Sequence, residues 1–135
     1  MTVHEERKQL VYWWIEKAQR SYESAQSEFD AGRYDITVSR LYYSVFYAVA
    51  AVLTAMEKEQ LLKKHSAVRA AFHLNMVKTM VVPKKYGSLY DKLFEARHRA
   101  DYQPMVEFES TIVQDYLTDA KDFLECMVVL AKEKC

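Results

Sequence analysis

The sequence predicts an all-α protein, an antiparallel helical bundle of about five helices that forms a single domain over residues 1–135. Half of the residues are hydrophobic, so the chain can build a core, and apolar residues recur at three- and four-residue steps. Only two glycines and two prolines occur. A sandwich or barrel of short strands needs many more turn residues, whereas long helices need only a few short links. We therefore expect a four-helix-bundle core.

The first helix is predicted over about residues 3–30. Thr2 and Glu5 have the spacing of a capping box, which favours a helix start at this point. Gly32 is the expected end, because glycine accepts the left-handed conformation that follows many helices. The predicted core-facing residues of this helix are Leu10, Trp14, Ala18, Tyr22, Ala25 and Phe29.

The second helix is predicted over about residues 34–57. From Leu41 onward it is apolar on nearly every side, which predicts a central helix that is covered by several others. The polar segment 57–64 is expected to be a loop. Ser66 is the predicted N-cap of a third helix, which runs to about Thr79.

A fourth helix is predicted to follow the segment "VVPKKYG" and to reach about Tyr102. Pro104 is expected to end it, because proline lacks an amide hydrogen and restricts the residue before it. The fifth helix is predicted over about residues 106–132. Its predicted core-facing residues are Phe108, Ile112, Tyr116, Ala120, Phe123 and Met127.

Composition excludes several classes of protein. Cys126 and Cys135 have neither the number nor the spacing of a disulfide framework or a metal site. The charged start of the chain is unlike a secretory signal. The uncharged run 41–56 is shorter than the ~20 residues that a membrane-spanning helix needs. We therefore expect a soluble, cytoplasmic protein with no membrane contact and no cofactor.

Charge is segregated along a chain whose formal net charge is zero. Residues 60–100 contain nine Lys or Arg against two Asp or Glu, and residues 101–125 contain seven acids and one lysine. The basic stretch is expected either to attract phosphate or to meet the acidic stretch of the same or a second chain.

Metal and nucleophile chemistry is poorly supported by the motifs. Glu95 and His98 have the Glu-x-x-His spacing of carboxylate-bridged metal sites, but this is the only copy and two arginines flank His98. There is no glycine-flanked nucleophile and no glycine-rich phosphate loop. We expect no metal site.

Arg97 is the strongest candidate functional residue. On a helix it shares one stripe with Tyr90, Phe94 and Asp101. At the edge of a core, a guanidinium needs a carboxylate, a phosphate or an aromatic face. The alternative is a plain surface ion pair between Arg97 and Asp101. Tyr102 follows five residues after Arg97, so the two cannot face each other on one regular helix.

Two further segments carry candidate residues. Arg40 precedes Tyr43 in an aromatic run, and these two either stack on each other or extend a polar groove towards the fourth helix. His65 and Ser66 lie at the predicted start of the third helix, where the free backbone N–H groups favour an anion. Solvated lysines are the alternative explanation for that segment.

The segments "RLYYSVFYA", "HSAVRAAFHLNMVKT" and "FEARHRADY", in this order on successive helices, resemble the HEPN superfamily. The chain is most similar to the small bacterial and archaeal HEPN proteins whose fourth-helix motif ends in Arg-x-x-x-Asp-Tyr. The resemblance covers nearly the whole chain. It implies an all-α bundle that pairs into a homodimer across its motif-bearing helices.

Many HEPN proteins are metal-independent ribonucleases, and often they are toxins that a nucleotidyltransferase encoded alongside neutralises. Their signature is an arginine, four to six residues, and a histidine, contributed by both chains to one cleft. In this sequence Arg97 matches the arginine, Tyr102 lies where histidine is usual, and His98 follows the arginine. A phenol with an ordinary pKa of ~10 is a poor proton carrier at neutral pH.

The sequence and the resemblance together predict a homodimeric binding module for a phosphate-bearing ligand, a nucleotide or RNA, or a partner of a nucleotidyltransferase in a toxin–antitoxin-like pair. The predicted ligand-binding residues are Arg97, Asp101, Tyr102, Arg40, Tyr43, His65 and Ser66. One alternative is a metal-independent ribonuclease with Arg97, His98 and Tyr102 as catalytic residues. A second alternative is a purely structural dimerisation module.

Overall fold

The computed structural model describes all residues 1–135 and contains helices but no strands, which confirms the all-α prediction. The α-helices are α1 (Val3–Asp30), α2 (Tyr34–Ala55), α3 (His65–Phe72), α4 (Lys84–Tyr102) and α5 (Ser110–Lys134). A short 3₁₀ helix, η1 (Glu59–Lys63), precedes α3, and a π-helical turn, η2 (His73–Val77), continues it.

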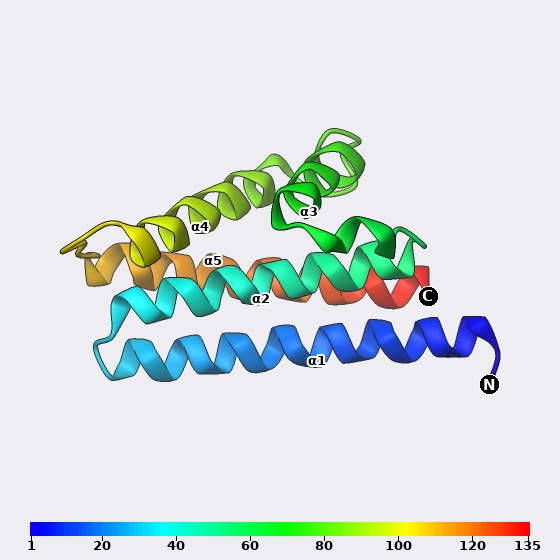
Figure 1. The fold of residues 1–135 in the computed structure, drawn as a ribbon, viewed down its shortest axis with the longest axis horizontal. Helices are drawn as coiled ribbons and strands as arrows, with labels where there is room; N and C mark the ends of the chain where they lie inside the picture. The colour runs from blue at the N-terminus through cyan, green and yellow to red at the C-terminus, as the bar shows by residue number, and fades with distance from the viewer.

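The helix α2 is the centre of the bundle, as predicted. It packs against α1, α4 and α5, and its C-terminal half also contacts η1 and α3. Figure 1 shows α1 and α4 on opposite sides of α2, with α5 behind it and α3 over its C-terminal half. Consecutive long helices run in opposite directions (Figure 1). Between Leu41 and Ala55 every residue is buried except Tyr43 and Tyr47, so these two mark the open face of α2.

By length and hydropathy, Tyr34–Ala55 could also cross a membrane, but 72% of its apolar window is buried inside the bundle. Such burial is typical of the core helix of a soluble protein. The apolar surface of α2 is therefore explained by packing against its neighbours.

The predicted ends of α1 are confirmed. The Thr2 hydroxyl accepts a hydrogen bond from the Glu5 amide at 3.1 Å, and the Thr2 amide donates to the Glu5 carboxylate, which completes the capping box. Gly32 has a φ of +78° directly after the helix, where a residue with a Cβ would be strained. The prediction for Leu10 was wrong, since it is 40% exposed and Val11 is buried instead. Adjacent residues lie ~100° apart on a helix, so on an outer helix such as α1, which faces the core with one side, the two do not both point inward.

The end of α2, both ends of α3 and the start of α4 differ from the predictions, since α4 begins at Lys84, within the segment that it was expected to follow. The helix α2 ends at Ala55, because Glu57 adopts a positive φ, and the polar segment after it forms η1 rather than an open loop. Lys64, not Ser66, is the N-cap residue of α3, and no side chain caps this helix. Ser66 is exposed and is the second residue of α3. The regular helix ends at Phe72 and continues only as the wider turn η2, so it does not reach Thr79.

The helix α5 begins later than predicted, at Ser110, so Phe108 precedes it. Ile112 is 44% exposed, and the buried residue is the adjacent Val113. Ala120, Phe123 and Met127 are buried as predicted, and Tyr116 is half-buried. Val113 lies on the same side of the helix as the buried residues farther along it. Ile112 is one residue earlier, so its side chain points about 100° away from that side.

Candidate functional site

Arg97 lies near the C-terminal end of α4, at the edge of the core. Its side chain is 24% exposed, and its Nε is 3.1 Å from Asp101 Oδ2, so the predicted ion pair is present. The N–H of Nε does not point at that oxygen, however, and the buried Nε has no hydrogen-bond acceptor. A partly exposed pair of this spacing contributes only ~0.3–0.5 kcal/mol. The intramolecular contacts of this guanidinium therefore leave hydrogen-bonding capacity unused.

Two tyrosine rings of α2 support the guanidinium of Arg97. Its Cζ lies 5.3 Å from the ring centroid of Tyr42 and 5.3 Å from that of Tyr43, within the range of cation–π attraction. The helix α4 reaches this position because Phe94, one turn earlier, packs edge-on against Tyr42 at 5.8 Å. The expected approach of Tyr43 to the residues of the fourth helix is therefore observed.

His65 lies over the same two tyrosines. As the first residue of α3, it places Nδ1 2.8 Å from the Tyr42 hydroxyl, and its ring stacks on Phe46 at 4.4 Å. Burial, and secondarily the Arg97 cation, lower the pKa of His65 from its ordinary value of 6.5. Burial raises the pKa of Tyr42 to about 12. At neutral pH, a neutral imidazole and a neutral phenol thus lie beside a permanent cation.

The lowered pKa of His65 predicts that the stability of the fold depends on pH. Because the unfolded chain binds the proton more readily than the folded one, folding stability decreases as pH falls below about 6.5. The change His65→Phe keeps an aromatic ring on Phe46 and removes the titrating group, so its unfolding free energy is expected to fall less steeply between neutral and mildly acidic pH. Urea denaturation at several pH values measures both slopes. Equal slopes for the two proteins would contradict the prediction.

The other predicted site residues lie elsewhere. Tyr102 is 69% exposed, and its ring contacts His98 at 4.8 Å rather than Arg97. His98 and Ser66 are exposed as well. Arg40 lines a groove between α1 and α2 and makes no ion pair with the residues around Arg97. The structure therefore brings Arg97, Asp101, Tyr43 and His65 together and leaves the other predicted residues outside this group.

A second polar cluster, next to the first, was missed by the sequence interpretation. Asp91 Oδ1 accepts a hydrogen bond from Arg69 Nε at 2.9 Å and lies 2.9 Å from His73 Nε2. The guanidinium of Arg69 lies 4.4 Å from the ring centroid of Phe94. The four-residue spacing of Arg69 and His73 indicates a shared helix face, but nothing local in the sequence indicates that Asp91 faces them. The role of Tyr42 was missed for the same reason.

Comparison with known proteins places the chain in a family. A model of the HEPN domain matches residues 11–133. A "UPF0332 protein" of Thermotoga maritima is 35% identical over 128 residues, which are 95% of this chain and 96% of that protein. A protein of Methanocaldococcus jannaschii named "Putative toxin MJ0142" is 34% identical over 110 residues, 82% of this chain and 74% of that protein. A second protein of that organism, "Putative toxin MJ0605", is 30% identical over 104 residues, 75% of this chain and 76% of that protein.

The resemblance found in the sequence motifs is therefore confirmed over nearly the whole length. A bundle centred on α2, with an arginine from α4 resting on its tyrosines, is the form that these motifs take in three dimensions. This chain belongs to the HEPN domain family.

Proposed function

We propose that this chain is a toxin-like HEPN protein that binds a phosphate-bearing ligand, a nucleotide or RNA, with Arg97. The observation that carries the proposal is the environment of that side chain. Its guanidinium is held over Tyr42 and Tyr43, its side chain is 24% exposed, and its pairing with Asp101 does not satisfy its Nε. Two relatives with "Putative toxin" in their names support the toxin-like role.

The chemistry of the neighbouring groups favours an anion. A guanidinium presents several N–H donors in one plane, which match the oxygens of a phosphate, and such charge-assisted bonds are about twice as strong as neutral ones. Asp101 is the one carboxylate paired with Arg97. Arg69 lies over the neighbouring Phe94 ring, where Asp91 pairs with it. His65 contributes a neutral imidazole, which can either donate or accept a hydrogen bond.

The proposed assembly is a homodimer, with a nucleotidyltransferase as the protein partner. Tyr102 and His98 form an exposed aromatic pair on the same end of α4 as Arg97. In a pair of chains joined across α2 and α4, the rings of one chain would lie near the Arg97 site of the other. This would give Tyr102 the contact with Arg97 that it lacks within one chain.

The change Arg97→Ala is expected to weaken binding of RNA, nucleotide and partner. A lost charge-assisted hydrogen bond costs about 1.5–3 kcal/mol, which is roughly a ten- to hundredfold loss of affinity. Titration calorimetry measures the affinity for each ligand. Arg99→Ala is the matched control, because Arg99 is an exposed arginine two residues away. Unchanged affinity for all three ligands would defeat the proposal. A variant that becomes monomeric with no change in ligand affinity would indicate the purely structural role.

A second candidate function is metal-independent ribonuclease activity. It is favoured by His65, because this neutral imidazole lies over the same tyrosines as Arg97. In such a reaction the imidazole takes the proton of the RNA 2′-hydroxyl. The 2′-oxygen then attacks the adjacent phosphorus, the bond to the 5′-oxygen breaks, and that oxygen leaves with a proton taken from water, which gives a 2′,3′-cyclic phosphate and a 5′-hydroxyl. Arg97 would stabilise the charge on the phosphate oxygens.

This candidate predicts different effects at two histidines. In excess chelator, the protein is expected to cleave single-stranded RNA, His65→Asn and Arg97→Ala are expected to abolish cleavage, and His98→Asn is expected to retain it. Gel analysis of end-labelled RNA measures all four proteins. Intact RNA with the unaltered protein would favour the binding module. If only His98→Asn lost cleavage, His98 rather than His65 would be the proton carrier.

A further inference from the structure

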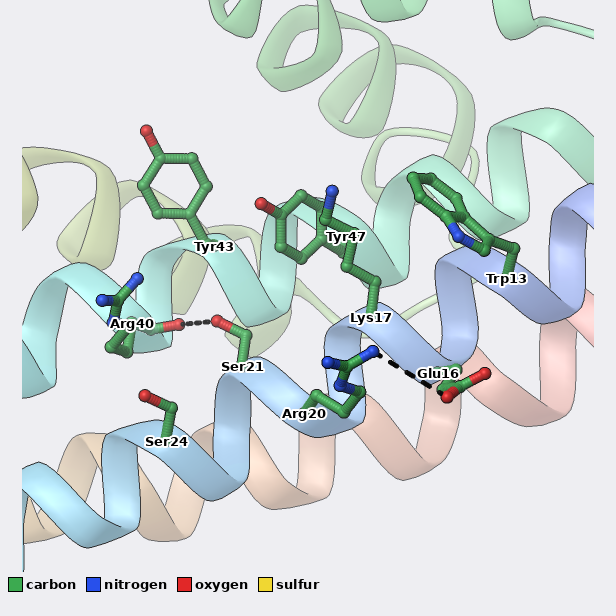
Figure 2. A pocket seen from close by; sticks show the side chains of 9 residues that line it. All are labelled: Trp13, Glu16, Lys17, Arg20, Ser21, Ser24, Arg40, Tyr43 and Tyr47. Atoms are coloured by element: carbon green, nitrogen blue, oxygen red, sulfur yellow. Dashed lines mark hydrogen bonds and ion pairs between the residues drawn. The ribbon is translucent and has the colours of Figure 1, made fainter.

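A groove of about 830 Å³ runs between α1 and α2, and Tyr43, one of the two rings that support Arg97, lines it. Figure 2 shows its walls, with Trp13, Lys17 and Arg20 among the side chains from α1, and Arg40, Tyr43 and Tyr47 from α2. The volume is in the range of sites that hold a small organic molecule, roughly 300–1,000 Å³. Its lining combines cations with aromatic rings.

The charge of the groove is positive. Three cations line it, Lys17, Arg20 and Arg40, against one acid, Glu16. Glu16 lies 4.0 Å from Arg20, so the one carboxylate is already paired. No carboxylate of the chain pairs with Arg40, although its guanidinium projects into the groove (Figure 2). An anionic group is therefore the natural partner of Arg40.

The aromatic rings provide stacking surfaces beside these charges. Tyr43 and Tyr47 lie one helical turn apart on α2, with ring centroids 5.8 Å apart. Trp13, at the end of the groove away from Arg40, is 49% exposed (Figure 2). The ammonium of Lys17 lies 4.6 Å from the Trp13 ring and 5.0 Å from the Tyr47 ring, so a cation and aromatic faces occupy the same small volume.

The walls are held in place by contacts between the two helices. The Ser21 hydroxyl donates a 2.8 Å hydrogen bond to the backbone carbonyl of Arg40, which ties α1 to α2 at the floor of the groove (Figure 2). Beneath Tyr47, the half-buried Trp14 stacks on that ring at 5.8 Å. A preformed site avoids much of the ordering cost of binding.

We propose that the α1–α2 groove binds a nucleotide, either free or within a single strand, with the base on Tyr47 and Trp13 and the phosphate at Arg40. A nucleotide joins an aromatic face to an anion, which is the combination that the groove offers. Tyr43 lines the groove and also supports Arg97, so the groove adjoins the site of the proposed function. Because the groove is proposed as an extension of that site, this proposal rests on phosphate binding at Arg97.

The test compares three ligands by titration calorimetry at one fixed salt concentration. The ligands are inorganic triphosphate, adenosine triphosphate and a short single-stranded oligoribonucleotide. The change Arg40→Glu is expected to weaken binding of the preferred nucleotide ligand by about tenfold or more, as expected for loss of a charged contact. Lys121→Glu is the matched control, because it makes the same charge change on an exposed position of α5, outside the groove.

The change Trp13→Leu separates stacking from charge. It is expected to weaken binding of the base-containing ligands about fivefold or more and to leave inorganic triphosphate unchanged. Adenosine triphosphate and the oligoribonucleotide distinguish a free nucleotide from one within a strand. Equal affinities of Arg40→Glu, Trp13→Leu and the unaltered protein for both base-containing ligands would overturn the proposal. Thermal melting of each variant shows that it is folded.

The same titrations separate this proposal from the proposed function. If Arg97→Ala weakens binding while Arg40→Glu and Trp13→Leu do not, the Arg97 site stands and the groove proposal fails. If the groove variants weaken binding while Arg97→Ala does not, the groove is a site of its own. In that case the proposed function at Arg97 fails, and with it the claim that the groove extends that site.

Discussion

Replacing Tyr42 by alanine is expected to lower the unfolding free energy by about 3–5 kcal/mol, the range for removing a buried aromatic ring. Tyr42 is fully buried, and its ring lies against Phe94, Tyr90 and Phe46. The substitution would leave a cavity between α2 and α4 and remove one of the two rings beneath Arg97. It would also remove the hydroxyl that contacts His65. Urea denaturation measures the loss.

Tyr42→Phe is the matched control, because it removes only the hydroxyl. Its expected cost is about 1 kcal/mol, since the ring contacts remain and one hydrogen bond is lost. The difference between the two variants isolates the contribution of the ring. If phenylalanine destabilised the protein as much as alanine, the Tyr42–His65 hydrogen bond would be the main interaction, and the ring would contribute little.

A comparable loss, again about 3–5 kcal/mol, is expected for Phe72→Ala. Phe72 is the last residue of α3, and it is fully buried against Tyr90 of α4 and Phe123 of α5. No other aromatic residue of α3 reaches both helices. We therefore expect the variant to loosen the segment from α3 to η2, which amide hydrogen exchange would detect as faster exchange there.

Leu74→Ala, two residues farther along, is the control for Phe72→Ala. Leu74 is 59% exposed, so its truncation is expected to change stability by less than about 0.5 kcal/mol. Equal effects of the two substitutions would mean that α3 does not anchor to the core through Phe72. Greater destabilisation by Leu74→Ala would indicate that an assembly covers this part of the surface.

The helices could be predicted from the sequence because their signals are local. Thr2 with Glu5, Gly32 and the sparse turn residues identify helix ends without knowledge of the rest of the chain. The registers of α1 and α5 could not be fixed in the same way. Leu10 and Val11, or Ile112 and Val113, are equally apolar neighbours, and only packing against another helix selects which one is buried.

The turns show the same limit. Glu57, Met80 and Met105 all adopt positive φ values, although none of them is a residue that typically marks a left-handed conformation. The tertiary structure imposes these conformations at the ends of helical segments. The end of the second helix was therefore predicted too late, and the segment after it was predicted to be a loop although it forms η1.

The candidate site was predictable only where its residues share a helix. The Arg97–Asp101 pair follows from a four-residue spacing, and its presence was foreseen. The contacts of Arg97 with Tyr42 and of His65 with Tyr42 join residues more than twenty positions apart. The pairing of Asp91 with Arg69 and His73 is also between helical segments. Such contacts depend on how the helices pack against one another, and this packing cannot be inferred from the local spacing of residues in one sequence.

The central position of α2 has a consequence for the order of events during synthesis on the ribosome. The α1–α2 hairpin consists of consecutive segments and can form as soon as both have emerged. Another side of α2, however, is covered by α5, the helix that comes last in this sequence. Until residues 110–134 leave the exit tunnel, a nascent chain therefore displays a long apolar surface, which is a substrate for chaperones and a route to aggregation.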